Sequence, residues 1–374
     1  MRRPRARTVA AGLVLASLVL ALAAASSAEA TPAIKASWRV IRTIGPDNTD
    51  LYEIAALRNH PSWLGGAAIS PAGDFYAVVY RLASGPLHQT ALSTQLGSEV
   101  NGLSATSRTN VWASLEDVPG GQVDRLTSHG WHPYSFAIGT DDVLVAPVVT
   151  TGPKNTWVLT EDFTTGIAYG YRFNGSTWHR HKLPAAPSAN SSTGYVTASA
   201  SNNIWTLTFT GSRPASMRYN GSKWQVFSFP AKLGPAAADL GPQQILAVSP
   251  KDVWATFSPN ATTGVGTLVL LHWNGRRWSK ISGKLPNASL TGAIASDGTG
   301  GVWLAAVNAT DTVPLILHYS HGKWSTFTAP KAKGKLIGIE QLALVPGTHS
   351  VLGTAIIAGS GMSTSGTAEV GFQH

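Results

Sequence analysis

Cysteine is absent from this sequence of 374 residues. Its absence excludes disulfides, thiolate zinc sites, cysteine nucleophiles and lipid attachment through a cysteine. A protein without disulfides is held together by its hydrophobic core alone. Hydrophobic residues make up 43% of the chain, and a chain of this length buries enough surface to be stable without covalent cross-links.

Charged residues are also scarce, at 13% of the chain. The 28 lysines and arginines outnumber the 19 acidic residues, which gives a formal net charge of +9. Four arginines and one glutamate lie in the first 30 residues, so the remainder carries +6, from 24 basic and 18 acidic residues. The basic residues are scattered and form no dense run. We therefore do not expect nucleic acid as a partner.

The N-terminus has the pattern of a secretory signal peptide. Four arginines precede an uncharged run over 8–25, and Ala28-Glu29-Ala30 supplies small residues for cleavage. The pattern predicts a signal peptide over 1–30 and a mature chain over 31–374, secreted and either extracellular or associated with the cell wall. The uncharged run of 18 residues could also span a bilayer as an uncleaved anchor. No other segment suggests a membrane contact.

Tryptophan forms the most regular pattern, because most of the 13 tryptophans fall into two interleaved series. The first series has spacings of 45 to 49 residues and consists of Trp63, Trp112, Trp157, Trp205, Trp254 and Trp303. The second has spacings of 46 to 54 residues and consists of Trp131, Trp178, Trp224, Trp278 and Trp324. A period of about 48 residues is typical of one four-stranded blade of a β-propeller.

Each unit predicts four strands. The second strand carries the first tryptophan, and the fourth strand opens with the second tryptophan. Between the third and fourth strands stand the pairs Asn174-Gly175, Asn220-Gly221 and Asn274-Gly275. Asn-Gly between apolar runs predicts a hairpin with a type I′ turn, which requires a positive φ at both central residues.

The same spacing places a further unit after Trp303. Adding 49 residues reaches Leu352, and this unit ends at His374 after three strands. The segment Trp38–Ile44 stands one period before the fourth strand of the first unit, and we expect it to complete the last blade and close the ring. The predicted fold is all-β, a seven-bladed β-propeller of four-stranded blades in a single domain. Six or eight blades would require that one unit is misread.

The units resemble those of a broad class of secreted bacterial β-propeller repeat proteins. Those units carry Asp-Val-Trp-Ala followed by His-Trp-Asn-Gly-x-x-Trp, and the best match here is Asp252-Val-Trp-Ala with the segment from His272 to Trp278. The resemblance covers nearly the whole chain after residue 30. It implies the propeller fold and no particular function, since propellers include binding scaffolds, lectins, hydrolases and lyases.

Two residue types could mark a binding site, and both have a structural explanation. The repeated tryptophans could stack on sugars, but their fixed place beside apolar neighbours favours packing between blades. His179 and His181 alternate on one strand beside Trp178 and could bind a metal. No third ligand is evident, which favours a solvated outer strand. The sequence predicts no catalytic residue and no organic cofactor.

Six carboxylates in three adjacent pairs form the candidate site. Glu116-Asp117 and Glu161-Asp162 follow Trp112 and Trp157 at the same repeat position, and Asp141-Asp142 stands in the connection between these units. We expect all six to lie on one face of blades two and three. There they could bind calcium, a hard cation that takes oxygen ligands, or a cationic partner. The alternative is ordinary charge in solvated surface loops.

The function stays open between three hypotheses. The first is a secreted, monomeric binding or scaffold propeller that recognises a protein or a cell-wall glycan without enzymatic activity. The second is a propeller hydrolase or lyase that acts on a polysaccharide with loop carboxylates. Such an enzyme would need a pair of acids or a histidine aimed into the central channel. The third is an envelope spacer without a specific ligand.

Overall fold

The computed structural model describes 17 stretches of the chain. They are residues 37–44, 49–58, 62–70, 72–82, 88–116, 121–135, 142–162, 167–185, 196–210, 213–231, 233, 240–259, 268–282, 288–308, 313–331, 335–358 and 365–373. The expected signal peptide over 1–30 lies outside these residues. Backbone contacts group residues 36–374 into one compact unit. Nowhere in the described stretches is there a helix with the length and apolar character needed to cross a membrane.

The strands pair into seven four-stranded antiparallel sheets, here called blades. Blade one contains β2 (Thr49–Ala55), β3 (Trp63–Ile69), β4 (Phe75–Arg81) and β5 (His88–Leu96). Blade two contains β6 (Glu99–Ser107), β7 (Asn110–Glu116), β8 (Gln122–Thr127) and β9 (Gly130–Ser135). Blade three contains β10 (Asp142–Gly152), β11 (Asn155–Asp162), β12 (Ile167–Phe173) and β13 (Trp178–Lys182). Blade four contains β14 (Val196–Ala200), β15 (Asn203–Thr210), β16 (Arg213–Tyr219) and β17 (Trp224–Ser228).

The remaining three blades follow the same order, except that the last one combines both ends of the described chain. Blade five contains β18 (Leu240–Ser249), β19 (Asp252–Pro259), β20 (Val269–Trp273) and β21 (Trp278–Lys280). Blade six contains β22 (Ala288–Ser296), β23 (Val302–Asn308), β24 (Pro314–Ser320) and β25 (Lys323–Thr328). Blade seven contains β26 (Lys335–Leu344), β27 (Val351–Ala358), β28 (Ser365–Gln373) and β1 (Ser37–Ile44).

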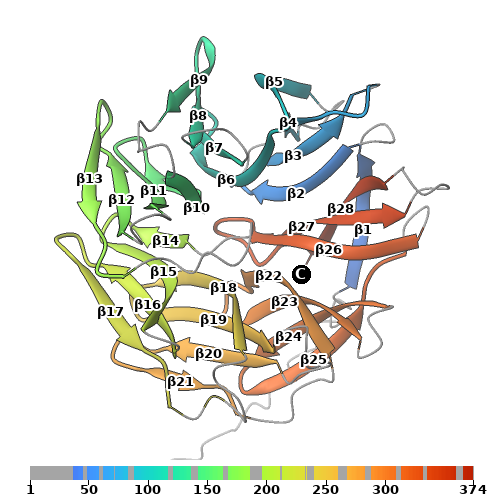
Figure 1. Cartoon of the computed structure of the whole chain (residues 1–374). Helices are drawn as coiled ribbons and strands as arrows, with labels where there is room; N and C mark the ends of the chain where they lie inside the picture. Colours follow the sequence, from blue (N-terminus) through green and yellow to red (C-terminus); the bar gives the residue numbers. More distant parts are fainter. Residues whose placement is uncertain are drawn as a thin grey trace, which may run out of the picture. The chain divides into compact units, whose positions relative to one another are not determined.

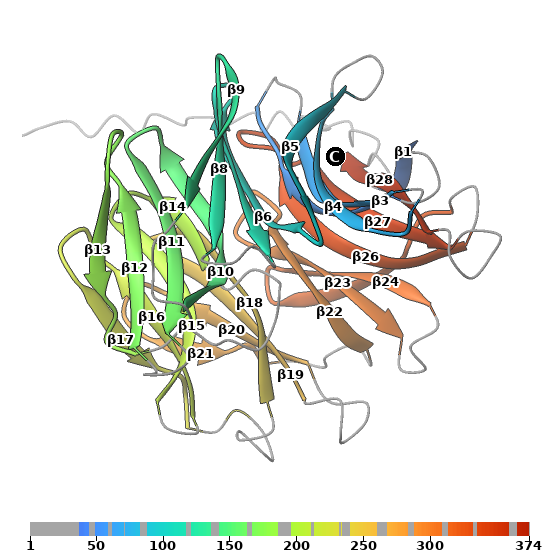
Figure 2. The same cartoon turned by 45° about the horizontal axis from the view of Figure 1, so that its top comes forward.

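The blades follow one another around a central axis (Figures 1 and 2). The first strand of each blade is innermost: β2 contacts β6, and the contacts continue through β10, β14, β18, β22 and β26 back to β2. The ring is closed within blade seven, where Trp38 of β1 pairs with Phe372 of β28. This is the pairing that the segment 38–44 predicted, and it leaves β28 with a partner on both edges.

The two tryptophan series pack against each other across the blade boundaries. A tryptophan on the second strand of one blade meets a tryptophan on the fourth strand of the next blade, edge to face, with ring centroids 5.4 to 6.4 Å apart. All six tryptophans of the first series are buried, with at most 3% of their surface exposed. The predicted role in packing between blades is confirmed, and it explains why the spacing recurs.

A second repeat position lies on the third strand, opposite each first-series tryptophan. It is filled by Arg125, Arg172, Arg218, His272 and His318 in blades two to six. The two histidines are hydrogen bonded to Asp252 and Asp297 at 2.8 and 2.9 Å. Arg172 instead donates its Nε–H to the neutral amide oxygen of Asn155 at 2.7 Å. A carboxylate therefore faces this position in blades five and six, and an amide faces it in blade three.

The Asn-Gly pairs mark three hairpins correctly, but the predicted turn type is wrong. Four residues separate Phe173 from its partner Trp178, and the Asn174 side chain accepts hydrogen bonds from the backbone N–H groups of Ser176 and Thr177. Gly175 has a φ of 108°, whereas Asn174 is not among the residues with positive φ. The asparagine acts as a cap for a four-residue loop. In the described residues, His321 is the one non-glycine with positive φ, at 49°.

Candidate functional sites

The inner strands enclose a cavity of about 310 Å³ on the central axis, here called the central channel. Residues of all seven inner strands line it and most of them are aliphatic, but polar atoms form the larger part of the lining surface. Hydroxyl and amide groups are added by Ser104, Thr150, Thr197, Gln244 and Gln341. Glu53 is the one ionisable residue among the described lining residues, and none of these residues is aromatic. The channel thus combines aliphatic surface with neutral hydrogen-bonding groups.

Glu53 carries a buried carboxyl group. A bulge in β2 between Leu51 and Glu53 precedes it, and only 6% of its surface is exposed. Burial raises the pKa of Glu53 to about 8, while hydrogen bonds from the Gln341 side chain and the Leu103 backbone oppose this rise. Because its pKa lies above neutral pH, Glu53 is mostly protonated at pH 7.

Glu53, Gln244 and Gln341 occupy one repeat position on the inner strands. Each lies opposite the second-strand residue two places after a first-series tryptophan or after its counterpart Leu352. A bulge precedes each of the three. The repeat tryptophans alone did not predict them, although a signal exists: Glu53 and Gln244 each stand ten residues before a repeat tryptophan.

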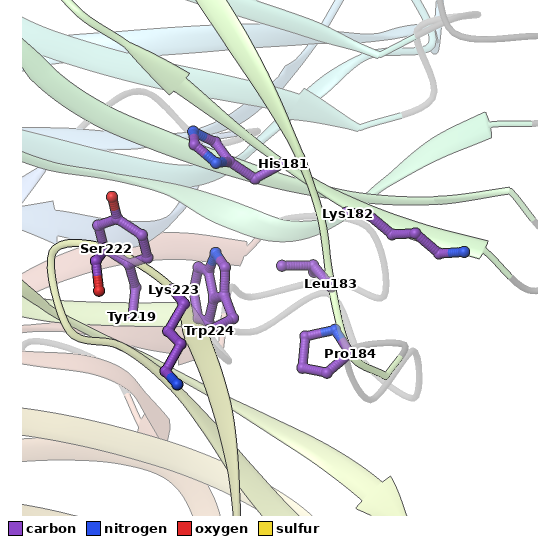
Figure 3. Close-up of a pocket in the computed structure, with 8 residues that line it drawn as sticks. All are labelled: His181, Lys182, Leu183, Pro184, Tyr219, Ser222, Lys223 and Trp224. Carbon is purple, nitrogen blue, oxygen red and sulfur yellow. The ribbon is translucent and has the colours of Figure 1, made fainter.

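A second hollow, of about 510 Å³, lies at the outer strands of blades three and four and is here called the cleft. One wall is the end of β13 and the residues that follow it, from His181 to Pro184; the other is the hairpin between β16 and β17. Figure 3 shows the indole of Trp224 between Tyr219 and Leu183, with the two lysine side chains extending away from it. Lys182 and Lys223 are exposed, whereas Trp224 is 9% exposed.

His181 lines the cleft and also packs against Trp157 in the core of blade three. Its ring lies 5.2 Å from the Trp157 ring and is half-buried, while His179 is exposed as expected for a solvated strand. Burial lowers the pKa of His181, and the charges of Arg172 and His179 lower it further. Arg172 lies opposite His179 in the pairing of β12 with β13, so a positively charged residue lies next to the strand that forms one wall of the cleft.

The six predicted metal ligands are placed only in part. Asp117 and Asp141 lie outside the described residues. Asp142 and Asp162 pair across blade three, with Glu161 beside them opposite Val143. Glu116 ends β7 in blade two, and the residue opposite it is Glu99, which accepts a hydrogen bond from the Tyr52 hydroxyl. The backbone therefore brings Asp142 and Asp162 together, and it adds Glu99, an acid that the sequence analysis did not include.

The described part of the chain shows no set of side chains that could bind a metal ion. No three histidine, aspartate or glutamate side chains come together there in a group that could hold a metal ion. Burial raises the pKa of Glu161, so the protein around it favours the neutral acid. The calcium site at Glu116, Asp117, Asp141, Asp142, Glu161 and Asp162 stays a prediction.

The titratable chemistry of the central channel comes from one carboxyl group among the described lining residues. Most glycoside hydrolases use two carboxyl groups on either side of the bond that is cleaved. Glu53 is the one carboxyl among the described residues that line the channel, and it is mostly protonated at neutral pH. Its side chain is hydrogen bonded to the Gln341 amide, whose oxygen also accepts from the backbone N–H of Leu342.

No known protein family and no curated protein matches this sequence. Solved β-propellers do match its structure. A structure of YCF48 bound to D1 peptide has 12% sequence identity and a TM-score of 0.55, and the match covers 90% of this chain and 96% of that one. The WD40 β-propeller domain of Doa1 has 11% identity and a TM-score of 0.52, with 90% and 97% covered.

A puromycin-hydrolysing peptidase from Mycobacterium tuberculosis is also similar in structure, with 10% identity and a TM-score of 0.54. The match covers 87% of this chain but 55% of the peptidase. At such low identities the comparisons show the fold, a β-propeller of four-stranded blades, and not the activity.

Proposed function

We propose that this protein is a non-catalytic binding propeller that holds a peptide segment of a partner protein at its central channel. The lining of the channel is the observation that carries this proposal. Aliphatic side chains and neutral amides match the side chains and backbone groups of a peptide. A sugar site usually includes an aromatic ring for stacking, and the described lining residues contain none.

The size and chemistry of the channel support the same proposal. A volume of about 310 Å³ is near the lower end of typical ligand pockets, so it suits a short segment or a chain end. The Gln341 amide bonds to Glu53 and accepts a hydrogen bond from the backbone N–H of Leu342, so a peptide group would exchange hydrogen bonds with an amide that already has partners. A similar propeller, YCF48, has been solved with a peptide bound, which shows that the fold accepts such a ligand.

The binding takes place outside the cytoplasm in this proposal. The arginines at the start, the uncharged run over 8–25 and the small residues at Ala28 and Ala30 support export. The absence of cysteine makes the fold independent of the redox state of its surroundings. A monomer is part of this proposal, and it is supported by the pairing of β1 with β28 within the chain, which covers an edge that a second copy could otherwise use.

Panning of a random peptide library on the purified protein tests the proposal. Selected peptides are then titrated by fluorescence polarisation against the protein and against a Gln244→Leu, Gln341→Leu double variant. Loss of two amides is expected to weaken binding about tenfold or more. Gln225→Leu, on the outer strand β17, is the matched control and is expected to bind as well as the parent. Peptides that bind all three proteins equally, or a library that yields no binders, would contradict the proposal.

A further inference from the structure

Acidic residues are missing from one long stretch of the sequence. Residues 163–238 contain no aspartate and no glutamate, so all 19 acids lie in the other 298 residues (374 less 76). The same stretch contains seven lysines and arginines: Arg172, Arg180, Lys182, Arg213, Arg218, Lys223 and Lys232. It includes β12 and β13 of blade three and all of blade four. This sector of the propeller therefore carries positive charges that no acidic residue of the same stretch neutralises.

The repeat position opposite the tryptophans contributes to the imbalance. In blade four the guanidinium of Arg218 lies 5.5 Å from the centre of the Trp205 ring. The residue that corresponds to Asp252 of blade five is Asn203, which accepts a hydrogen bond from Trp205 instead of supplying a negative charge. Blade three has Asn155 at the same place. Arginine with asparagine occurs in blades two, three and four, whereas histidine with aspartate occurs in blades five and six.

The cleft lies within this basic sector. All eight residues that line it fall between positions 181 and 224, so both walls come from the acid-free stretch. Its rim carries the exposed ammonium groups of Lys182 and Lys223, and Arg172 lies close enough to influence His181. Its floor is apolar, formed by Leu183, Tyr219 and Trp224 (Figure 3).

We propose that the cleft binds a segment of an anionic polysaccharide, with carboxylate or phosphate groups of the chain at Lys182 and Lys223. The exposed ring of Pro184, beside the small accessible part of Trp224, would contact the apolar face of a sugar unit. Positive charge on both walls favours an anionic chain over a neutral one. This site is separate from the central channel, so it does not depend on the proposed peptide ligand.

Calorimetric titration with three oligomers of matched length tests this site. The probes are a glycerol phosphate oligomer, a polygalacturonate oligomer and neutral dextran. Binding of one or both anionic oligomers is expected, weaker at higher salt, with no binding of dextran. The phosphate and carboxylate probes show which anionic group is preferred. A Lys182→Glu, Lys223→Glu double variant is expected to bind about tenfold or more weakly.

Two further variants separate the cleft from the general charge of the protein. Lys323→Glu is the matched control, because Lys323 is exposed and precedes Trp324 as Lys223 precedes Trp224. It should leave binding unchanged. Ser222→Trp keeps the charge but fills the cleft, and it should abolish binding. The proposal is overturned if no anionic oligomer binds, if Lys323→Glu weakens binding as much as the double variant, or if Ser222→Trp binds normally.

Discussion

The tryptophans of the first series connect neighbouring blades at the scale of single residues. Trp205 contacts Trp273 and Trp278 of the next blade, is fully buried, and donates its indole N–H to Asn203 at 2.9 Å. Trp205→Ala is expected to lower the free energy of unfolding by about 3–5 kcal/mol, because it leaves a large cavity at a blade boundary. Urea denaturation measures the change.

Phe75→Ala is the control for this substitution, since Phe75 is 49% exposed and lies at the start of β4. Its removal should change the free energy of unfolding by much less. An equal loss for both variants would mean that the tryptophan contacts do not hold the blades together.

Glu53 makes stability depend on pH. Its pKa is about 8 in the folded protein and 4.5 in the unfolded chain, so the folded state binds the extra proton between these values. Stability is therefore expected to fall as the pH rises from 4.5 toward 8. Glu53→Gln removes this group and should flatten the profile, with the largest gain near pH 8. The free energy of unfolding at pH 5 and pH 8, compared for the two proteins, is the measurement. A parallel pH dependence in both would contradict the assignment.

Some properties of single residues could be predicted from the sequence, and others could not. The burial of the tryptophans could be predicted because the same residue recurs beside apolar neighbours. Glu53, Gln244 and Gln341 could not be assigned to one site in this way, because they are distant in sequence and meet only when the inner strands surround one axis. His181 was predicted to be on a solvated strand, but it is half-buried because its ring packs near Trp157.

At the scale of elements, β1 closes the ring. It pairs with β28 along its whole length, and Trp38 packs against Trp303 with ring centroids 5.4 Å apart. Deletion of residues 1–44 is expected to lower the melting temperature and to promote association through the freed edge of β28. Deletion of residues 1–36 is the control and should leave the melting temperature unchanged. Similar melting temperatures for the two truncations would contradict the closure.

The acidic edge of blades two and three gives a second test at this scale. The backbone of Asp142 lies opposite that of Asp162 in the pairing of β10 with β11, and calcium takes several carboxylate oxygens as ligands. If the predicted calcium site exists, calcium raises the melting temperature of the protein but not that of an Asp142→Asn, Asp162→Asn variant. No shift in the parent protein would mean that these acids are ordinary surface charge.

At this scale, the sequence predicted the positions of three hairpins but not their turn type. Asn-Gly placed three of them between the correct strands, because glycine supplies the positive φ that a tight connection needs. The turn type was wrong because the asparagine side chain competes for the backbone N–H groups of the loop, as the bonds to Asn220 from Ser222 and Lys223 show. Local propensity gave the place of the turn and not its geometry.

At the scale of the whole molecule, the propeller combines two hollows with different chemistry. The central channel has a mostly polar but nearly uncharged surface, and it is formed by every blade. The cleft belongs to two blades and lies in a stretch without acids. The repeat pattern predicted the ring of four-stranded blades, since it depends on residues that recur. Neither hollow could be predicted, because a ligand site depends on the positions where the repeats differ.

The central claim is that the channel holds the ligand, and blocking the channel tests it most directly. Ala198 lines the channel, is half-buried and also packs against the apolar core that contains Trp157, so Ala198→Phe adds bulk at the channel wall without replacing any of its polar groups. The measurement is the dissociation constant of a panned peptide for the protein and for this variant, both first shown to be folded by circular dichroism. A rise of about tenfold or more in the dissociation constant is predicted. An unchanged dissociation constant in the folded variant would contradict the account.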